Sequence, residues 1–154
     1  MLYLFDIDGT LVDTGGAGLA ALQEASREIF GDEGPVLDLA GSTDLGIVAE
    51  IYLHFQIEPT RERIDTYLAV YFLRLEWNLA HGNFPGRVFE GAAELLVELK
   101  QRPQAAVGLL TGNAECGAAT KMRHFGLAEH FSFGAYGCDH ADRNCLGPIA
   151  MERA

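Results

Sequence analysis

Apolar runs alternate with segments of helical periodicity along this chain. Residues 1–5 and 105–110 are almost purely apolar, and residues 131–135 form a third short apolar segment. Short apolar runs that end in polar residues and glycine are typical of buried strands. Between them, apolar residues recur at spacings of three and four, which predicts helices. This alternation predicts an α/β fold with a Rossmann-like parallel sheet and right-handed crossovers.

Capping signals place the ends of the expected helices. Ser42 or Thr43 can cap one helix, Thr60 a second and Asn113 a third, while Gly31 is a plausible C-terminal stop for the helix before them. The last helix is expected to begin at Pro148. The expected helices cover about 19–30, 44–55, 61–80, 91–101, 114–125 and 148–154.

The segment 15–83 does not fit a single crossover between strands, because it is too long and entirely helical. It is best interpreted as a helical cap inserted into an α/β core formed by residues 1–14 and 84–154. The junctions at 15–18 and 81–83 contain glycine and could act as hinges.

Composition narrows the classes of protein. The chain has 154 residues, 49% of them hydrophobic, and a net charge of −11. It is long enough for one ordinary globular core, and its charge disfavours nucleic acids and anionic membranes as partners. No apolar run is long enough to span a bilayer. The three cysteines do not form a secreted disulfide framework, and no signal-type N-terminus is present, so a cytoplasmic location is expected.

The candidate site lies at the carboxyl ends of the predicted strands, where open parallel sheets bind ligands. Asp6 and Asp8 follow the first strand, and Thr111 follows the second. A helix N-terminus after Thr111 adds partial positive charge that favours phosphate, and carboxylate oxygens suit Mg²⁺. The expected phosphate cradle adds the backbone N–H groups of Gly9, Thr10, Gly112 and Asn113.

Two carboxylates of this kind suit phosphoryl transfer. Asp6 directly ends the strand and is the better nucleophile, whereas Asp8 could protonate the leaving oxygen and later activate water. Mg²⁺ would offset the repulsion between the nucleophile and an anionic phosphate. From the local pattern alone, a solvated turn remains an equal alternative. A calcium loop is disfavoured because its further oxygen ligands are missing.

Segment 5–13, FDIDGTLVD, resembles the first signature of the haloacid dehalogenase superfamily, and segment 109–113, LLTGN, resembles its second. The helical insertion between them is similar to the family's first type of cap. The likeness is greatest to the phosphoglycolate phosphatase-like branch. It implies a Mg²⁺-dependent phosphatase of a small phosphorylated metabolite, acting through an aspartyl-phosphate.

The resemblance also implies residue roles. Asp6 would be the nucleophile and a metal ligand. Asp8 would be the acid/base, with its backbone carbonyl as a second metal ligand, and Thr111 would hydrogen-bond the phosphoryl group. The third signature is a Lys or Arg, for which Arg143 is the candidate. Lys121 is an alternative, although it lies earlier in the chain than the family order places this cation. The presence of Asp8 argues against dehalogenation.

The family's fourth signature, an acidic run after a further strand, is absent. We therefore expect a C-terminally truncated form of a longer enzyme, with strands missing and the strand 1–5 left as an exposed edge. A homodimer or a swapped element is expected to cover that edge. Two alternatives remain open: an impaired fragment that binds phosphate or a partner, and a sugar-phosphate phosphatase or phosphomutase.

Two weaker patterns accompany these signatures. Cys138, Asp139, His140 and Cys145 lack the paired close spacings of a zinc site, so zinc is not expected. The segment 41–44, GSTD, either caps a helix or reaches the active site as a specificity loop.

Overall fold

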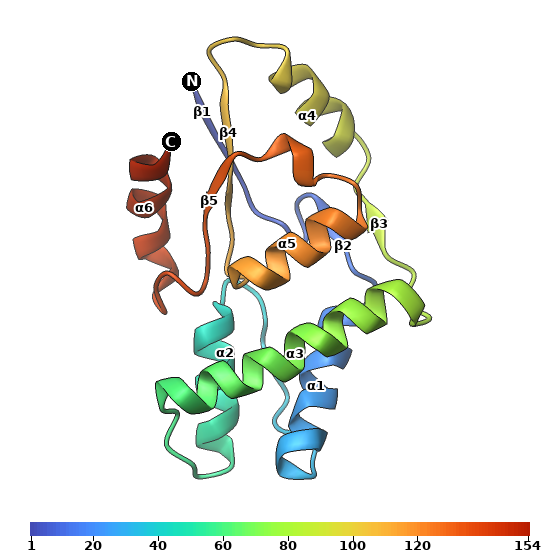
Figure 1. Ribbon diagram of the computed structural model, residues 1–154, viewed down its shortest axis with the longest axis vertical. Helices are drawn as coiled ribbons and strands as arrows, with labels where there is room; N and C mark the ends of the chain where they lie inside the picture. The colour runs from blue at the N-terminus through green and yellow to red at the C-terminus, as the bar shows by residue number, and fades with distance from the viewer.

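The computed structural model describes residues 1–154 and contains a three-stranded parallel sheet in the order β1-β4-β5. These strands are β1 (Leu2–Phe5), β4 (Ala106–Leu110) and β5 (Phe133–Ala135). Tyr3 pairs with Val107, and Leu109 pairs with Gly134. Figure 1 shows the strands side by side in the upper half of the molecule. The predicted parallel α/β architecture is thus confirmed.

Helices cover both faces of this sheet because side chains alternate along each strand. Val107 and Leu109 pack in one cluster with residues of α4 (Ala92–Lys100) and α5 (Glu115–His124). Leu110 faces the other way, toward α6 (Leu146–Arg153), which lies alone on that side in Figure 1. Two short 3₁₀ helices, η1 (Ala128–His130) and η2 (Arg143–Cys145), occupy the loops that flank β5.

Three further helices form a second hydrophobic core below the sheet: α1 (Ala17–Phe30), α2 (Asp44–His54) and α3 (Arg61–His81) (Figure 1). The buried Tyr67 hydroxyl donates to the Leu22 carbonyl at 2.7 Å and lies 2.8 Å from Ser26 Oγ, which joins α3 to α1. The predicted N-caps Thr43 and Thr60 are confirmed. That these helices are a separate cap bounded at 15 and 83 stays a prediction.

A two-stranded antiparallel sheet joins the two junctions between these cores. It pairs β2 (Val12–Asp13) with β3 (Arg87–Val88). Beyond it, Gly15 has a φ of +64°, and a Cβ there would lie 2.8 Å from the Pro85 backbone. This pairing was not predicted, because strands of two residues are too short for hydrophobic periodicity to reveal.

The last helix begins at Leu146 and not, as predicted, at Pro148. Pro148 therefore lies in the first turn of α6, where backbone N–H groups have no helical acceptor and a proline removes no hydrogen bond. The sheet order leaves β1 paired with β4 alone, so β1 is an edge strand as expected. None of the helices combines the length and the apolar character that crossing a bilayer demands.

Candidate active site

Asp6 leaves the end of β1 and is held from two directions. Its Oδ1 accepts the Ile7 backbone N–H at 2.8 Å, and its Oδ2 accepts a hydrogen bond from Arg143 in η2. The Asp6 and Arg143 side chains are 30% and 29% exposed, so the ion pair stays within reach of solvent. The structure thus brings the expected third-signature cation to the expected nucleophile across 137 positions of sequence.

Asp8 has a cation of its own. Lys121 on α5 donates to both carboxylate oxygens of Asp8, at 2.9 and 2.7 Å, and to Asn113 Oδ1 at 2.6 Å. The Lys121 side chain is 5% exposed and that of Asp8 is 47% exposed, so the ammonium is enclosed while the carboxylate stays open to solvent. Both cations considered from the sequence therefore lie in the site, one on each carboxylate.

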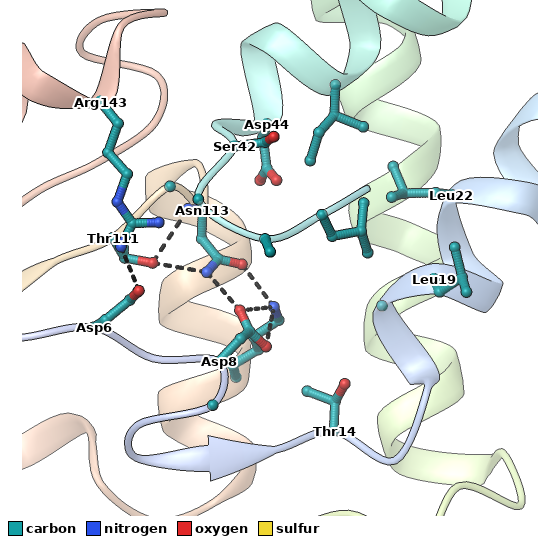
Figure 2. A pocket seen from close by; sticks show the side chains of 18 of the residues that line it. Asp6, Asp8, Thr14, Leu19, Leu22, Ser42, Asp44, Thr111, Asn113 and Arg143 are labelled. Carbon is teal, nitrogen blue, oxygen red and sulfur yellow. Dashed lines mark hydrogen bonds and ion pairs between the residues drawn. The ribbon is translucent and has the colours of Figure 1, made fainter. Parts of the chain in front are cut away.

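Asn113 does not cap the following helix, which corrects the prediction. The N-cap is Ala114, without a side-chain hydrogen bond. The Asn113 Nδ2 donates instead to Asp8 Oδ2 at 2.8 Å and to Thr111 Oγ1 at 2.8 Å. Asn113 therefore links the Thr111 hydroxyl at the end of β4 to Asp8, as Figure 2 shows, and it also accepts a hydrogen bond from Lys121.

The expected backbone donors are mostly engaged within the protein. The Gly9 N–H donates to the Val12 carbonyl at 3.0 Å, and the Thr10 N–H donates to the Ile7 carbonyl at 3.3 Å. These bonds close the tight loop after β1, for which Gly9 adopts a φ of +76°. Gly9 and Gly112 line the same cavity as the carboxylates, whereas Thr10 does not. Their role as a phosphate cradle stays a prediction.

The segment Ser42–Asp44, at the start of α2, docks on the core beside these groups. The Asp44 N–H donates to the Gly112 carbonyl at 2.8 Å, and Asp44 Oδ2 accepts the Ala114 N–H at 2.7 Å. Thr43 Oγ1 donates to the Ala141 carbonyl at 2.9 Å. The Asp44 carboxylate, although it belongs to α2, therefore accepts a backbone N–H at the start of α5, where Asn113 was predicted to act as the N-cap. The segment thus both caps α2 and reaches the site.

Replacing Gly112 with alanine is expected to separate this segment from the core. A Cβ at position 112 would overlap the Ser42 carbonyl oxygen, and backbone on both sides leaves little room to shift. Overpacking of this kind destabilises by roughly 1–3 kcal/mol. Limited proteolysis should cut the 31–43 connection faster in Gly112→Ala than in wild type. Gly147→Ala is the control, because a Cβ there meets nothing within 4 Å. Equal cleavage in all three proteins would contradict the prediction.

Burial raises the pKa of Asp44 to about 6, because the carboxylate loses its water. The Ala114 N–H and the Lys121 ammonium favour the ionised form and lower this pKa, whereas the Asp8 charge raises it. Asp44 is therefore a buried acid whose ionisation opposes folding.

The pH dependence of stability should reflect this residue. A folded-state pKa above the unfolded value contributes stability that is complete below about pH 4 and is lost as the pH rises through about 6. Relative to Asp44→Asn, which carries no titrating group, wild type should lose about 2–3 kcal/mol of unfolding free energy over this range. Urea titrations of both proteins at several pH values measure the difference. A pH-independent difference would contradict the prediction.

The carboxylates open into one cavity of about 390 Å³ between the sheet edge and the three lower helices. Its core side carries Asp6, Asp8, Thr111 and Asn113 together with both cations. Its other side is formed by α1, the 39–42 segment, α2 and α3. Figure 2 shows Leu19 and Leu22 on the side opposite Asp6, with Asp44 between. The structure thus brings seven of the eight sequence-predicted site residues to a single cavity, Thr10 being the exception.

The donor set at this edge fits a hard divalent cation. Asp6 supplies carboxylate oxygens, whereas the Asp8 carboxylate is engaged by Lys121 and Asn113, so Asp8 would offer its backbone carbonyl oxygen to the metal. Mg²⁺ is bound in proteins through one or two carboxylates, with water and substrate phosphate completing its shell. No cluster of three or more His, Cys, Asp or Glu side chains is present.

Fold and site together describe an α/β protein with a carboxylate-lined cavity beneath a layer of helices. The family model of the haloacid dehalogenase-like hydrolases matches residues 1–154. The chain therefore belongs to this family of hydrolases, as the two signatures indicated. No curated protein matches it significantly.

Solved structures share the fold at low sequence identity. CbbY from Rhodobacter sphaeroides, in complex with phosphate, is 21% identical with a TM-score of 0.77; the match covers 98% of this chain and 71% of CbbY. A mutant CbbY bound to xylulose-(1,5)bisphosphate is 20% identical with a TM-score of 0.76; the match covers 98% of this chain and 71% of the mutant. A predicted phosphoglycolate phosphatase from Haemophilus somnus is 18% identical with a TM-score of 0.59; the match covers 89% of this chain and 62% of that protein. The chain therefore spans about two thirds of the length of these proteins.

The contact of Asp44 with the start of α5 was not predicted from the sequence. Lys121 was predicted only as an alternative to Arg143 for the cation of the third signature. For Lys121 a signal was present: it falls on the same helical face as Gly117, Ala118 and Met122, all buried. A lysine in an otherwise small and apolar helical stripe needs a buried partner. For Asp44 no local signal distinguishes a distant partner from ordinary capping of its own helix.

Proposed function

We propose that this protein is a Mg²⁺-dependent phosphatase that hydrolyses a small phosphate monoester through an aspartyl-phosphate on Asp6. The observation that carries the proposal is the arrangement of two carboxylates on one cavity, each with its own cation: Arg143 on Asp6 and Lys121 on Asp8. Family membership supports a hydrolase, and the solved relatives include a phosphate complex.

In this proposal an Asp6 carboxylate oxygen attacks phosphorus, and the bond from phosphorus to the ester oxygen breaks. Protonated Asp8 gives its proton to the departing alkoxide. Asp8, now a carboxylate, takes a proton from water as that water attacks the acyl phosphate, which releases inorganic phosphate and restores Asp6. Both proton transfers use the same carboxyl group, so the cycle closes without a further acid or base.

The remaining residues bind and orient the phosphoryl group. Arg143 contacts Asp6 and offers its guanidinium to the negative charge that collects on the phosphoryl oxygens. The Thr111 hydroxyl is held by Asn113 at the end of β4 and can donate to the same oxygens. Lys121 and Asn113 hold the Asp8 carboxylate in place between Asp6 and the helices opposite. The Asp6 carboxylate and the Asp8 backbone carbonyl would hold Mg²⁺, which would supply positive charge that offsets the repulsion between the anionic phosphate and the anionic nucleophile.

Removal of divalent metal tests the proposal directly. Release of phosphate from p-nitrophenyl phosphate is expected with added MgCl₂, to stop with excess EDTA, and to return when MgCl₂ is restored. The same titration should raise the melting temperature, because a ligand that binds only the folded state stabilises it. Phosphate release that EDTA leaves unchanged would contradict the proposed dependence on Mg²⁺. The absence of phosphate release under any condition would favour a protein that binds phosphate without hydrolysing an ester.

A further inference from the structure

The helical wall of the active-site cavity carries no cation. This wall consists of residues of α1, the 39–42 segment, α2 and α3, and its side chains are apolar, small or neutral apart from one acid. The larger of them are Leu19, Leu22, Leu39, Ile47 and Tyr71, and the acid is Asp44. A leaving group that extends from the phosphoryl site toward the helices therefore meets mostly hydrocarbon.

All positive side chains of the cavity stand on its core side. They are Lys121 and Arg143, and each already contacts a carboxylate of the reaction centre. Figure 2 shows Arg143 and Asp6 across the cavity from Leu19 and Leu22. Lys121 is engaged by Asp8, and Arg143 is the cation that this mechanism offers to the phosphoryl group. A second anionic group on the substrate would find no unpaired Lys, Arg or His among the lining residues.

A second anion would also meet an unfavourable electrostatic environment. Asp44 lies on that wall, 7% exposed, with its carboxylate oxygen engaged by the Ala114 N–H. A second carboxylate or phosphate of the substrate, placed against this acid and the leucines, would lose its own hydration water. No cation on the wall would replace that water, which is costly in a low-dielectric site. An uncharged group loses no such hydration and gains contact with the leucine side chains.

We propose that the substrate is a phosphate monoester whose leaving group is compact, uncharged and partly apolar. This inference rests on the proposed phosphatase function and narrows its substrate class. This class of substrate excludes phosphoglycolate, after which the branch that the sequence resembles is named, and bisphosphates such as the one bound in the mutant CbbY. A cavity of about 390 Å³ is at the small end of ligand sites, which fits a compact leaving group.

A matched pair of ligands tests the charge of the leaving group. Isobutyl phosphate and phosphoglycolate have nearly the same shape, with two methyl groups in place of two carboxylate oxygens. Their affinities for Asp6→Asn, which should bind without turnover, can be measured by calorimetry beside inorganic phosphate. Isobutyl phosphate is expected to bind at least about tenfold more tightly than phosphoglycolate.

The outcomes separate this inference from the proposed function. Equal or tighter binding of phosphoglycolate would overturn the uncharged leaving group and leave the phosphatase proposal standing. Binding of inorganic phosphate alone would do the same, because the helical wall would then accept no leaving group of this size. No binding of any of the three would overturn the phosphoryl site and, with it, this inference.

A charge-introducing variant provides an independent check on the wall itself. Leu19 lines the cavity and is 39% exposed, so a lysine fits there without burying its charge. In the Asp6→Asn background, Leu19→Lys should move the affinity ratio toward phosphoglycolate by about tenfold, the effect of one new ion pair in a partly enclosed site. Leu19→Met preserves volume without charge and should leave the ratio unchanged. An unaltered ratio in Leu19→Lys would show that leaving groups do not reach this wall, which overturns the proposal.

Discussion

Replacing Asp6 with asparagine is expected to lower phosphate release by at least about 10³-fold, the scale on which enzymes lose activity when a covalent nucleophile is removed. The amide oxygen is a poor nucleophile toward phosphorus and cannot form the acyl phosphate. The fold should survive, because asparagine can still accept the Ile7 N–H through its side-chain oxygen. Steady-state phosphate release from p-nitrophenyl phosphate measures the change, and circular dichroism verifies the fold.

Asp65→Asn is a matched control for this substitution. Asp65 lies on the exposed surface of α3 and forms an i,i+4 pair with Arg61 at 3.0 Å, with both side chains more than half exposed. Exposed pairs of this kind contribute little to stability, so activity and melting temperature should stay near wild type. If Asp6→Asn kept activity comparable to that of Asp65→Asn, a covalent intermediate on Asp6 would be excluded.

Replacing Lys121 with methionine is expected to lower kcat by on the order of 10²-fold, the lower range for loss of acid–base catalysis. Lys121 acts through Asp8: its ammonium contacts both oxygens of that carboxylate and the Asn113 side chain. Without it, Asp8 keeps only the Asn113 amide as a side-chain partner and is free to rotate. Methionine fills the space of the buried alkyl stem, so packing of α5 should be retained.

The split between kcat and KM distinguishes positioning of Asp8 from a general loss of structure. A positioning role predicts a fall in kcat with a smaller change in KM for p-nitrophenyl phosphate, because Arg143 and Thr111 still bind the phosphoryl group. Lys100→Met is the control; Lys100 is the only other lysine, is 57% exposed and lies 3.6 Å from Glu129. A kcat for Lys121→Met equal to that of Lys100→Met would remove Lys121 from the mechanism.

The two cations also bear on how a chain with a net charge of −11 would bind the phosphate that we propose as its substrate group. Two of the eleven Lys and Arg side chains line the cavity, Lys121 enclosed beneath Asp8 and Arg143 beside Asp6. Acidic side chains elsewhere on the surface are screened within about 10 Å at ordinary ionic strength, so their repulsion of an anion in the cavity is weak. For binding of an anion, the charges that line the cavity therefore matter more than the net charge of the chain.

Local sequence was sufficient to predict the framework of this protein. The apolar run before Asp6 defined β1, and Gly31, Thr43 and Thr60 defined helix ends, because strand burial and capping depend on residues within a few positions of one another. The sheet-edge rule then brought Asp6, Asp8 and Thr111 together correctly, since parallel strands end at a common edge.

Tertiary structure decided which partner each of these groups received. Lys121 reaches Asp8 across 113 positions, and Asp44 reaches the start of α5 across 70. With that helix start already occupied, the Asn113 side chain turns to Thr111 and Asp8. The β2–β3 pair is likewise a long-range contact between segments of two residues each. Such contacts depend on how the two cores pack against each other, and periodicity and capping preferences contain no information about that packing. The sequence alone therefore determined the three strands of the parallel sheet, the main helices and the carboxylates at the sheet edge. Only the folded chain determined which carboxylate each cation contacts, where the Asn113 amide turns and which helices form the opposite wall.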